Sequence, residues 1–289
     1  SQVICPYRGC ELGVRHLRVM GDLGQIHFPE YQLLDKSTVD DSVKYSHVVI
    51  NMAMQEHKTR HYTMTDVNVD GARIVARAAA EAGASRLIHI SALGADPDSP
   101  SEYLRTKALG EQAVLEEFPT ATIFRPAVMI GDEDNFLNRL ANIHGLPGPF
   151  PLANYGQTVK QPVYVGDVAR AIVAATADPA SEGAVYELVG PKQYTMAGIC
   201  EYIGETLREP MWTVGLPDEA TPFLRIPFRL AEIPRLTMYP NLAEFYRYTL
   251  DDVVTKGAPG LADLGVNATT MEEVGIRVLR RYRKHIFHD

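Results

Sequence analysis

Tyr103 and Lys107 are the two residues whose types and spacing point most directly to chemistry. A spacing of four positions places both side chains on one face of a helix. A lysine ammonium beside a phenol stabilises the phenolate, so we expect Lys107 to lower the pKa of Tyr103. Such a tyrosine can exchange a proton with a carbonyl or an alcohol during hydride transfer. The pair therefore predicts the acid–base part of a reductase site.

Ser91 supports this interpretation because it ends a predicted buried strand over residues 86–91, twelve positions before Tyr103. The carboxyl ends of strands in an open α/β sheet face the ligand crevice. A serine at this edge could hydrogen-bond the same substrate oxygen as Tyr103. The structural alternative is a serine that caps the next turn and a tyrosine that packs on the sheet.

Four further residues are candidates for contacting a dinucleotide. Arg8 follows the apolar run at residues 3–5, and no carboxylate stands beside it there. An arginine at this place accommodates the 2′-phosphate of NADP, so Arg8 favours NADPH over NADH. Asp35 is placed to contact an adenine amino group, while Pro126 and Val128 close a strand where the nicotinamide would lie. The alternatives are an ordinary exposed arginine, a helix N-cap and a simple strand end.

Strand and helix patterns alternate over the first 190 residues and would position these side chains. Strands are expected at residues 3–5, 25–34, 47–54, 86–91, 121–130, 161–165 and 184–189. Helices are expected at residues 35–45, 65–82, 101–118, 167–176 and 196–207. The strand at residues 47–54 is apolar on both faces, as in a parallel strand covered by helices. We therefore predict an α/β fold with a Rossmann-like, doubly wound parallel sheet.

The expected phosphate-binding turn has no counterpart near Ser1. A Rossmann unit begins with a strand and a glycine-rich turn that binds the pyrophosphate. Only Ser1 and Gln2 precede the strand that carries Arg8, and the glycines after that strand do not replace the turn. We therefore expect the first strand and the glycine-rich loop, roughly thirty residues, to be missing from this chain.

The composition changes after about residue 207. Residues 208–250 combine many prolines with aromatic residues, which predicts short helices and turns. We divide the chain into a Rossmann-like domain at residues 1–207 and a smaller, mainly helical docking lobe at residues 208–289. The apolar side chains of this lobe form either an internal core or a surface that docks on a partner.

Residues 277–289 contain five basic side chains: Arg277, Arg280, Arg281, Arg283 and Lys284. This tail is either a solvated helix or a docking element for an acidic partner or an anionic lipid surface.

The overall composition excludes several classes of protein. With 28 basic and 36 acidic residues, the net charge of −8 argues against a nucleic-acid-binding protein. No stretch approaches the roughly 18 unbroken apolar residues of a membrane span. The three cysteines, Cys5, Cys10 and Cys200, indicate neither a disulfide framework nor a metal site.

Several segments together resemble a known superfamily. Ser91, Tyr103 with Lys107, Arg125 with Pro126, and the strand at residues 186–191 resemble the atypical, extended short-chain dehydrogenases/reductases. Within that superfamily the chain is similar to the NADPH-binding accessory subunits of mitochondrial respiratory complex I. The segments that carry this similarity span the whole chain and lie at residues 1–8, 16–25, 48–51, 103–111, 159–165, 259–265 and 278–281.

The resemblance implies a peripheral protein on the matrix side of the mitochondrial inner membrane. It would hold NADPH for structure, assembly or stability, outside the electron path. Ser91, Tyr103 and Lys107 would be vestigial or would contact the cofactor, and Asn51 joins the implied cofactor contacts. The C-terminal lobe and the basic tail would contact other complex I subunits or inner-membrane phospholipid. Two alternatives stay open: a free NADPH-dependent reductase or epimerase, and a redox sensor whose NADPH occupancy alters docking.

Overall fold

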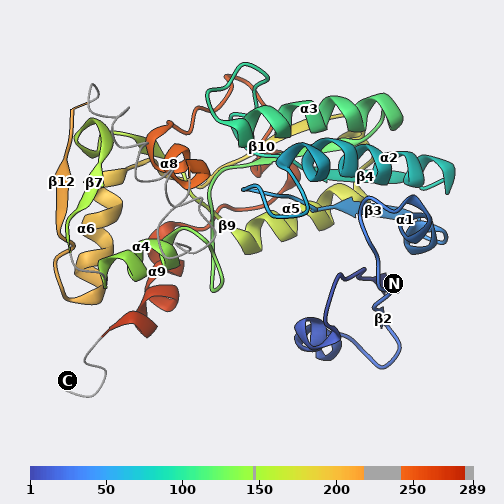
Figure 1. The fold of residues 1–289 in the computed structure, drawn as a ribbon, viewed down its shortest axis with the longest axis horizontal. Coiled ribbons are helices and arrows are strands. Elements are labelled where there is room, and N and C mark those ends of the chain that lie inside the picture. The colour runs from blue at the N-terminus through green and yellow to red at the C-terminus, as the bar shows by residue number, and fades with distance from the viewer. Residues whose placement is uncertain (146–147, 218–241, 284–289) are drawn as a thin grey trace.

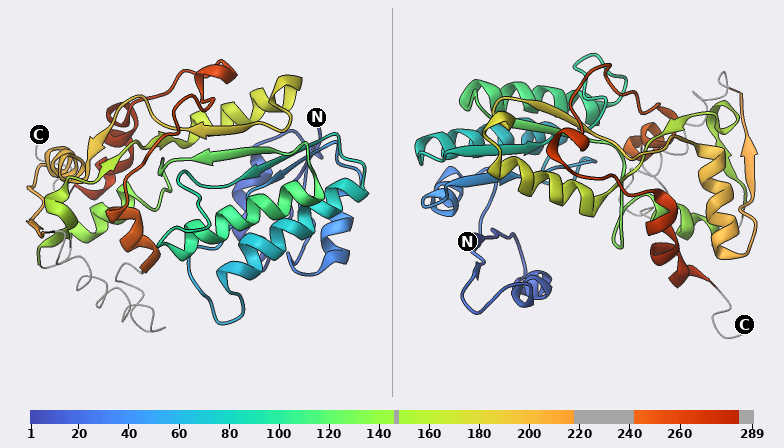
Figure 2. Two further views of the ribbon diagram at one scale, coloured as in Figure 1. Left: turned by 90° about the horizontal axis from the view of Figure 1, so that it is seen from above. Right: turned by 180° about the vertical axis from the view of Figure 1, so that it is seen from behind.

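The computed structural model describes residues 1–145, 148–217 and 242–283. At its centre is a parallel sheet with the strand order β10–β5–β4–β3 (Figure 1). Its strands are β3 (Val48–Asn51), β4 (Arg86–Ile90), β5 (Thr122–Pro126) and β10 (Val185–Leu188). Helices α2 (Ala72–Glu81) and α3 (Glu102–Glu117) lie on one face, and α5 (Val165–Ala177) lies on the other (Figures 1 and 2). The predicted doubly wound α/β class is therefore confirmed.

The sequence of β4 explains why helices cover both faces of the sheet. Leu87 packs with the α2 and α3 side chains, whereas its neighbour Ile88 packs with α5. Ile123 and Phe124 of β5 divide between the same two cores. A strand buried on both faces needs apolar residues at successive positions, and these strands have them.

The edge strand β3 departs from the expectation for residues 47–54. Val49 and Asn51 are buried, but Ile50 is 40% exposed. Ile50 pairs with Ile88, and α5 covers Ile88 from its place over β4, β5 and β10. The expectation of burial on both faces is wrong here because α5 does not reach the edge of the sheet.

The N-terminal residues form a separate small unit. Strands β1 (Val3–Ile4) and β2 (Ile26–His27) pair in parallel with each other, apart from the central sheet. A 3₁₀ helix, η1 (Glu11–Val19), connects them and buries none of its residues (blue in Figure 1). The expected strands at residues 3–5 and 25–34 thus exist in shortened form. They lie outside the central sheet.

A second lobe packs around one continuous core. Its helices are α4 (Leu137–His144), α6 (Met196–Leu207), α8 (Leu242–Thr249) and α9 (Met271–Leu279), and β7 (Phe150–Leu152) pairs with β12 (Thr213–Gly215). This core combines Leu140 of α4, Ile203 of α6 and Val278 of α9. It therefore draws on residues before and after position 207, and the division at that position stays a prediction. Residues 218–241 of the predicted proline-rich region lie outside the described residues.

Short elements complete the described chain. The helical ones are α1 (Lys36–Val43), η2 (Asp66–Gly71), η3 (Ala153–Gly156), η4 (Pro179–Ser181), η6 (Ala262–Leu264) and η7 (Arg280–Tyr282). The strands are β6 (Met129–Ile130), which pairs with β9 (Val163–Tyr164), and β8 (Val159–Lys160), which pairs with β11 (Tyr194–Thr195). Of these, η2 is a π-helical turn that leads directly into α2.

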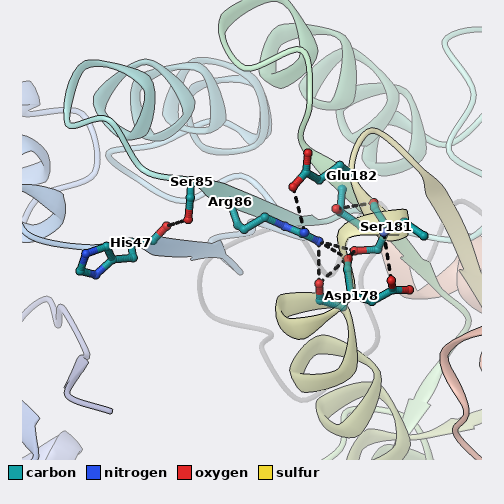
Figure 3. Close-up of polar contacts among 9 residues, drawn as sticks. His47, Ser85, Arg86, Asp178, Ser181 and Glu182 are labelled. Carbon is teal, nitrogen blue, oxygen red and sulfur yellow. Dashed lines mark hydrogen bonds and ion pairs between the residues drawn. The ribbon is translucent and has the colours of Figure 1, made fainter.

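Arg86 fastens α5 to the amino end of the sheet. Its buried guanidinium donates to the carbonyl oxygens of Ala175 at 2.6 Å and Asp178 at 2.9 Å (Figure 3). It also donates to Oγ of Ser181 and to Oε1 of Glu182, the latter at 3.1 Å (Figure 3). The last carbonyls of α5 have no partner inside the helix, so Arg86 satisfies part of that need.

The basic C-terminal segment contacts its own chain in the part that is described. Arg281 donates to Oδ1 of Asn138 at 2.5 Å, and Nε of Arg283 donates to the carbonyl of Thr206 at 2.8 Å. These bonds hold η7 against α4 and α6. They favour an anchored helix end over a free tail, while residues 284–289 lie outside the described residues.

No helix within the described ranges is long and apolar enough to cross a membrane. The same ranges contain no group of at least three His, Cys, Asp or Glu side chains that could hold a metal ion. Cys5, Cys10 and Cys200 are all free thiols.

Candidate functional site

A cleft of about 990 Å³ opens at the carboxyl ends of β4 and β5. Its volume is within the usual range for a small-molecule site. Ser91, Tyr103, Pro126 and Val128 all line it, so four of the predicted site residues come together here. Segments of the second lobe, including α8, form the opposite wall. The ligand-facing edge expected for an open α/β sheet is thus the edge that is hollowed.

Ser91 lies just beyond the end of β4 and is 3% exposed. Its backbone N–H donates to the carbonyl of Phe124 at 2.7 Å, which holds it beside β5. Its Oγ has no hydrogen-bond partner among the described residues, so it does not cap the following turn. A buried hydroxyl without a partner costs about 1–3 kcal/mol, and a ligand in the cleft could remove that cost.

Lys107 lies below the cleft wall and is only 1% exposed. Its Nζ donates to the carbonyl of Ile90 at 2.8 Å, at the last residue of β4. Burial lowers the pKa of Lys107 to about 8, although the nearby carboxylates of Glu111 and Glu56 oppose this shift. The lysine therefore supports the strand end from beneath and does not itself line the cleft.

Tyr103 presents its hydroxyl to Sδ of Met54 at 3.9 Å. Burial raises the pKa of Tyr103 well above its ordinary value, and the Glu56 carboxylate raises it further, whereas Arg247 lowers it. The expectation that Lys107 lowers the pKa of Tyr103 is therefore wrong for this structure. The physical reason is that Lys107 gives its hydrogen bond to a backbone carbonyl, while a carboxylate lies near the phenol.

Asn51 and His89 form a buried polar pair behind the cleft. Nδ2 of Asn51 donates to Nδ1 of His89 at 3.2 Å, and Oδ1 of Asn51 accepts from the N–H of Ala53 at 3.1 Å. Burial, with the nearby charge of Lys107, lowers the pKa of His89 to about 3, so the imidazole is neutral. Its proton then sits on Nε2, which has no partner among the described residues. The Asn51 side chain serves the turn after β3 and is not on the cleft wall.

Arg8 and Asp35, assigned to the adenosine end of a dinucleotide, lie apart from the cleft lining. Arg8 is exposed, with Cζ 5.2 Å from the ring centre of Tyr62. Asp35 accepts from the N–H of Ser37 at 3.1 Å and from its hydroxyl at 2.7 Å, which makes it the N-cap of α1. The structure thus gathers the predicted residues of the nicotinamide end and leaves those of the adenosine end separate.

Sequence reasoning missed an ion pair that lines the cleft. Glu56 follows β3, Arg247 belongs to α8, and the two form an ion pair. No spacing in the sequence signals this pair, because 191 positions separate its members. Lys160, bonded to Oδ1 of Asp252 at 3.0 Å, also lines the cleft and was not predicted.

Comparison with known proteins adds the family. The RmlD substrate binding domain family matches residues 14–222, and the chain belongs to it. A mouse protein, NADH dehydrogenase (ubiquinone) 1 alpha subcomplex subunit 9, mitochondrial, is 40% identical over 286 residues. The match covers 99% of this chain and 75% of the mouse protein. The chain belongs to the subunit 9 family. The resemblance drawn from the sequence is therefore confirmed.

Solved structures place this chain in a Rossmann-type fold. The dTDP-glucose 4,6-dehydratase of Streptomyces venezuelae, solved with NAD and TYD, has a TM-score of 0.69 at 17% identity, over 98% of this chain and 88% of that one. The dTDP-4-dehydrorhamnose reductase of Bacillus anthracis, solved with NADP, has a TM-score of 0.58 at 17% identity, over 86% and 97%. At these identities the similarity concerns the fold alone. One neighbour contains NAD and the other NADP, so the fold does not choose between them.

Proposed function

We propose that this chain is an accessory subunit of mitochondrial NADH:ubiquinone oxidoreductase, respiratory complex I. The observation that carries the proposal is the 40% identity to mouse subunit 9 over 99% of the chain. Similarity over this length includes the second lobe, which lies outside the nucleotide fold. Other complex I subunits are then the partners. We further propose that the chain lies on the matrix side of the inner membrane.

The residues of the cleft fit the nicotinamide end of a dinucleotide. The buried Ser91 hydroxyl lacks a partner among the described residues and lines the cleft, as does Tyr103. Both hydroxyls could hydrogen-bond the nicotinamide end, with Pro126 and Val128 beside the ring. A nicotinamide cofactor, when bound, supplies hydride-transfer chemistry.

We propose NADPH as the cofactor. Arg8 is exposed beside Tyr62, and its guanidinium provides the positive charge that a 2′-phosphate needs. Asn51 would act indirectly, by fixing the turn after β3 through its bond to Ala53. Asp35 would stay the cap of α1.

The geometry of the cleft favours a cofactor that is bound for structure over one that is used in catalysis. An acid–base tyrosine is most effective when its pKa lies near the working pH, and that of Tyr103 is raised away from it. Lys107 donates to the Ile90 carbonyl and is not the partner of the phenol. A structural role outside the electron path accords with this geometry. We propose protein neighbours as the main partners of the lobe, because Arg281 and Arg283 already have internal acceptors and are less available to phospholipid.

Native electrophoresis of gently solubilised mitochondrial membranes, with mass spectrometry of each band, tests this proposal. We expect the chain in the large NADH dehydrogenase band and NADPH in the extract of the purified protein. Migration near the mass of a monomer or a dimer would contradict the subunit role. Protease treatment of intact and of opened inner-membrane vesicles, followed by detection of the chain, would test whether it lies on the matrix side.

A free reductase is the second candidate, because Ser91 and Tyr103 both face the cleft. It predicts oxidation of NADPH by the isolated chain in the presence of carbonyl compounds. Turnover that disappears in Tyr103→Phe would favour this candidate over the structural role.

A further inference from the structure

Glu56 and Arg247 join the two walls of the cleft. Glu56 lies in the segment that follows β3, and Arg247 lies on α8 in the second lobe. Their side chains form an ion pair and are only 19% and 16% exposed, respectively. A pair this well shielded from water is less screened than a surface pair, and losing one partner leaves the other charge poorly solvated. The contact therefore has an energetic consequence for both walls.

The Glu56 side of the pair is fixed to the helix that carries Tyr103. The neighbouring Gln55 donates its N–H to Oδ1 of Asn68 at 2.8 Å, and its carbonyl accepts from Nδ2 of Asn68 at 2.9 Å. The same Nδ2 donates to Oγ1 of Thr106 on α3 at 3.0 Å. One turn earlier on α3, the Tyr103 hydroxyl lies against Met54. The segment 54–56 is thus held at the cofactor end of the cleft.

The Arg247 side of the pair is fixed to the core of the second lobe. Tyr248, the next residue, is buried, and its ring lies 5.7 Å from that of Phe150 and 6.1 Å from that of Phe136. Arg247 itself also donates to the carbonyl of Asn135 at 3.2 Å. A displacement of Arg247 therefore moves a helix that is packed into this core.

We propose that Glu56 and Arg247 are positioning residues that couple the occupied dinucleotide site to the second lobe. This inference rests on the proposed function, because it requires a cofactor in the cleft. A dinucleotide that contacts Ser91 and Tyr103 further restricts the motion of the adjoining segment 54–56. Glu56, held more firmly, then keeps Arg247, and with it α8, in one position. By thermodynamic reciprocity, a fixed α8 also strengthens cofactor binding. The pair gives a cofactor outside the electron path a way to act on assembly.

Hydrogen exchange of the full chain, with and without saturating NADPH, tests this coupling. We expect NADPH to slow exchange in the peptide over residues 242–249 by about fivefold or more in the wild-type chain. Glu56→Gln and Arg247→Gln should abolish that response although both variants still bind NADPH. Glu116→Gln is the matched control, because Glu116 pairs with Arg73 on the exposed surface between α2 and α3. It should respond as the wild type does.

A charge-reversed double variant separates coupling from general damage. Glu56→Arg with Arg247→Glu should regain at least part of the response that each single variant loses. Binding of NADPH without any change at residues 242–249 in the wild type would overturn the coupling and leave the proposed function standing. An undiminished response in Glu56→Gln would overturn it as well. A wild-type chain that binds no NADPH would overturn the coupling and the proposed cofactor, and would leave the subunit role standing.

Discussion

Lys107 donates its hydrogen bond to the carbonyl of Ile90 at 2.8 Å, from a side chain that is almost fully buried. The lysine therefore braces the end of β4, next to Ser91, and does not activate Tyr103. Spacing along α3 correctly predicts that Tyr103 and Lys107 share a helix face. It does not predict where the long lysine side chain ends, because burial and the nearest acceptor decide that.

Lys107 should make the free energy of unfolding vary with pH in the alkaline range. Its pKa falls to about 8 in the folded chain, so between about pH 8 and pH 10.5 the unfolded chain binds more protons than the folded one. Wild-type stability should therefore rise through this window relative to Lys107→Met, by on the order of 3 kcal/mol in total. Urea unfolding of both chains at a series of pH values measures the difference. Parallel curves for the two chains would show that the lysine is not desolvated.

His89 should produce the corresponding effect in acid. The pKa of His89 is lowered to about 3 in the folded chain. Below about pH 6.5 the imidazole is therefore protonated in the unfolded chain and stays neutral in the folded chain. The wild type should lose stability relative to His89→Gln as the pH falls from about 6.5 toward 4. Thermal melts in buffers across this range check the prediction. His47→Gln is a suitable control, since His47 lies near the surface at the opposite end of the sheet (Figure 3). A difference that stayed constant with pH would contradict a neutral His89.

Ser91→Ala should separate cofactor binding from stability. The Oγ that it removes is buried and has no partner among the described residues, so we expect the free energy of unfolding of the cofactor-free chain to rise by about 1 kcal/mol. Affinity for NADPH should fall about fivefold, the value of one neutral hydrogen bond. Calorimetric titration and thermal melts measure the two quantities.

Ser181→Ala is the matched comparison for that prediction. The Ser181 hydroxyl is buried too, but it donates to the carbonyl of Ala175 at 2.9 Å, far from the cleft. Its loss should reduce stability by about 1 kcal/mol and leave NADPH affinity unchanged. Equal effects of the two substitutions on affinity would remove the assignment of Ser91 to the cofactor.

Local sequence patterns predict the helices well. The helices predicted at residues 35–45 and 196–207 correspond to α1 and α6 within two residues at each end. These signals depend on neighbours within one or two turns, and a single sequence contains all of them. The predicted helix at residues 65–82 instead begins as a π-helical turn. There Asn68 bonds to Gln55 and to Thr106, contacts from distant segments that no local pattern reveals.

The cleft was predictable only in part, because some of its contacts also join segments that are distant in the sequence. Ser91 and Pro126 follow strands of one sheet, so the topology alone brings them together. The Glu56–Arg247 pair depends on how the second lobe packs against the first, which requires the tertiary arrangement. Residue type suggested an adenosine contact for Asp35, but its carboxylate accepts hydrogen bonds from the N–H and the hydroxyl of Ser37.

Arg86→Met should destabilise the fold without changing NADPH binding in the cleft. The substitution leaves the carbonyls of Ala175 and Asp178 without their guanidinium donor at the end of α5. Removing one partner from a buried charged network costs about 3 kcal/mol. Denaturant unfolding should show this loss, with NADPH affinity within twofold of the wild type at a temperature where the variant is folded. Arg86→Lys should lose less, because it keeps a charge and a donor. A loss of affinity in the folded variant would mean that α5 supports the cleft as well.

Gly110→Ala should disturb the contact between α3 and η2. A Cβ at Gly110 would lie 2.2 Å from the carbonyl oxygen of Asn68, so the two elements must move apart. Because Asn68 also holds Gln55 beside Glu56, the shift should weaken the ion pair to Arg247 as well as the packing of α3. We expect a loss of about 2 kcal/mol in unfolding free energy and faster hydrogen exchange at residues 242–249. Gly83→Ala separates the two effects: Gly83 has a φ of +70° and open space around it, so its substitution should lower stability through backbone strain alone. Faster exchange at residues 242–249 in Gly83→Ala to the same degree would contradict a specific path from Asn68 to α8.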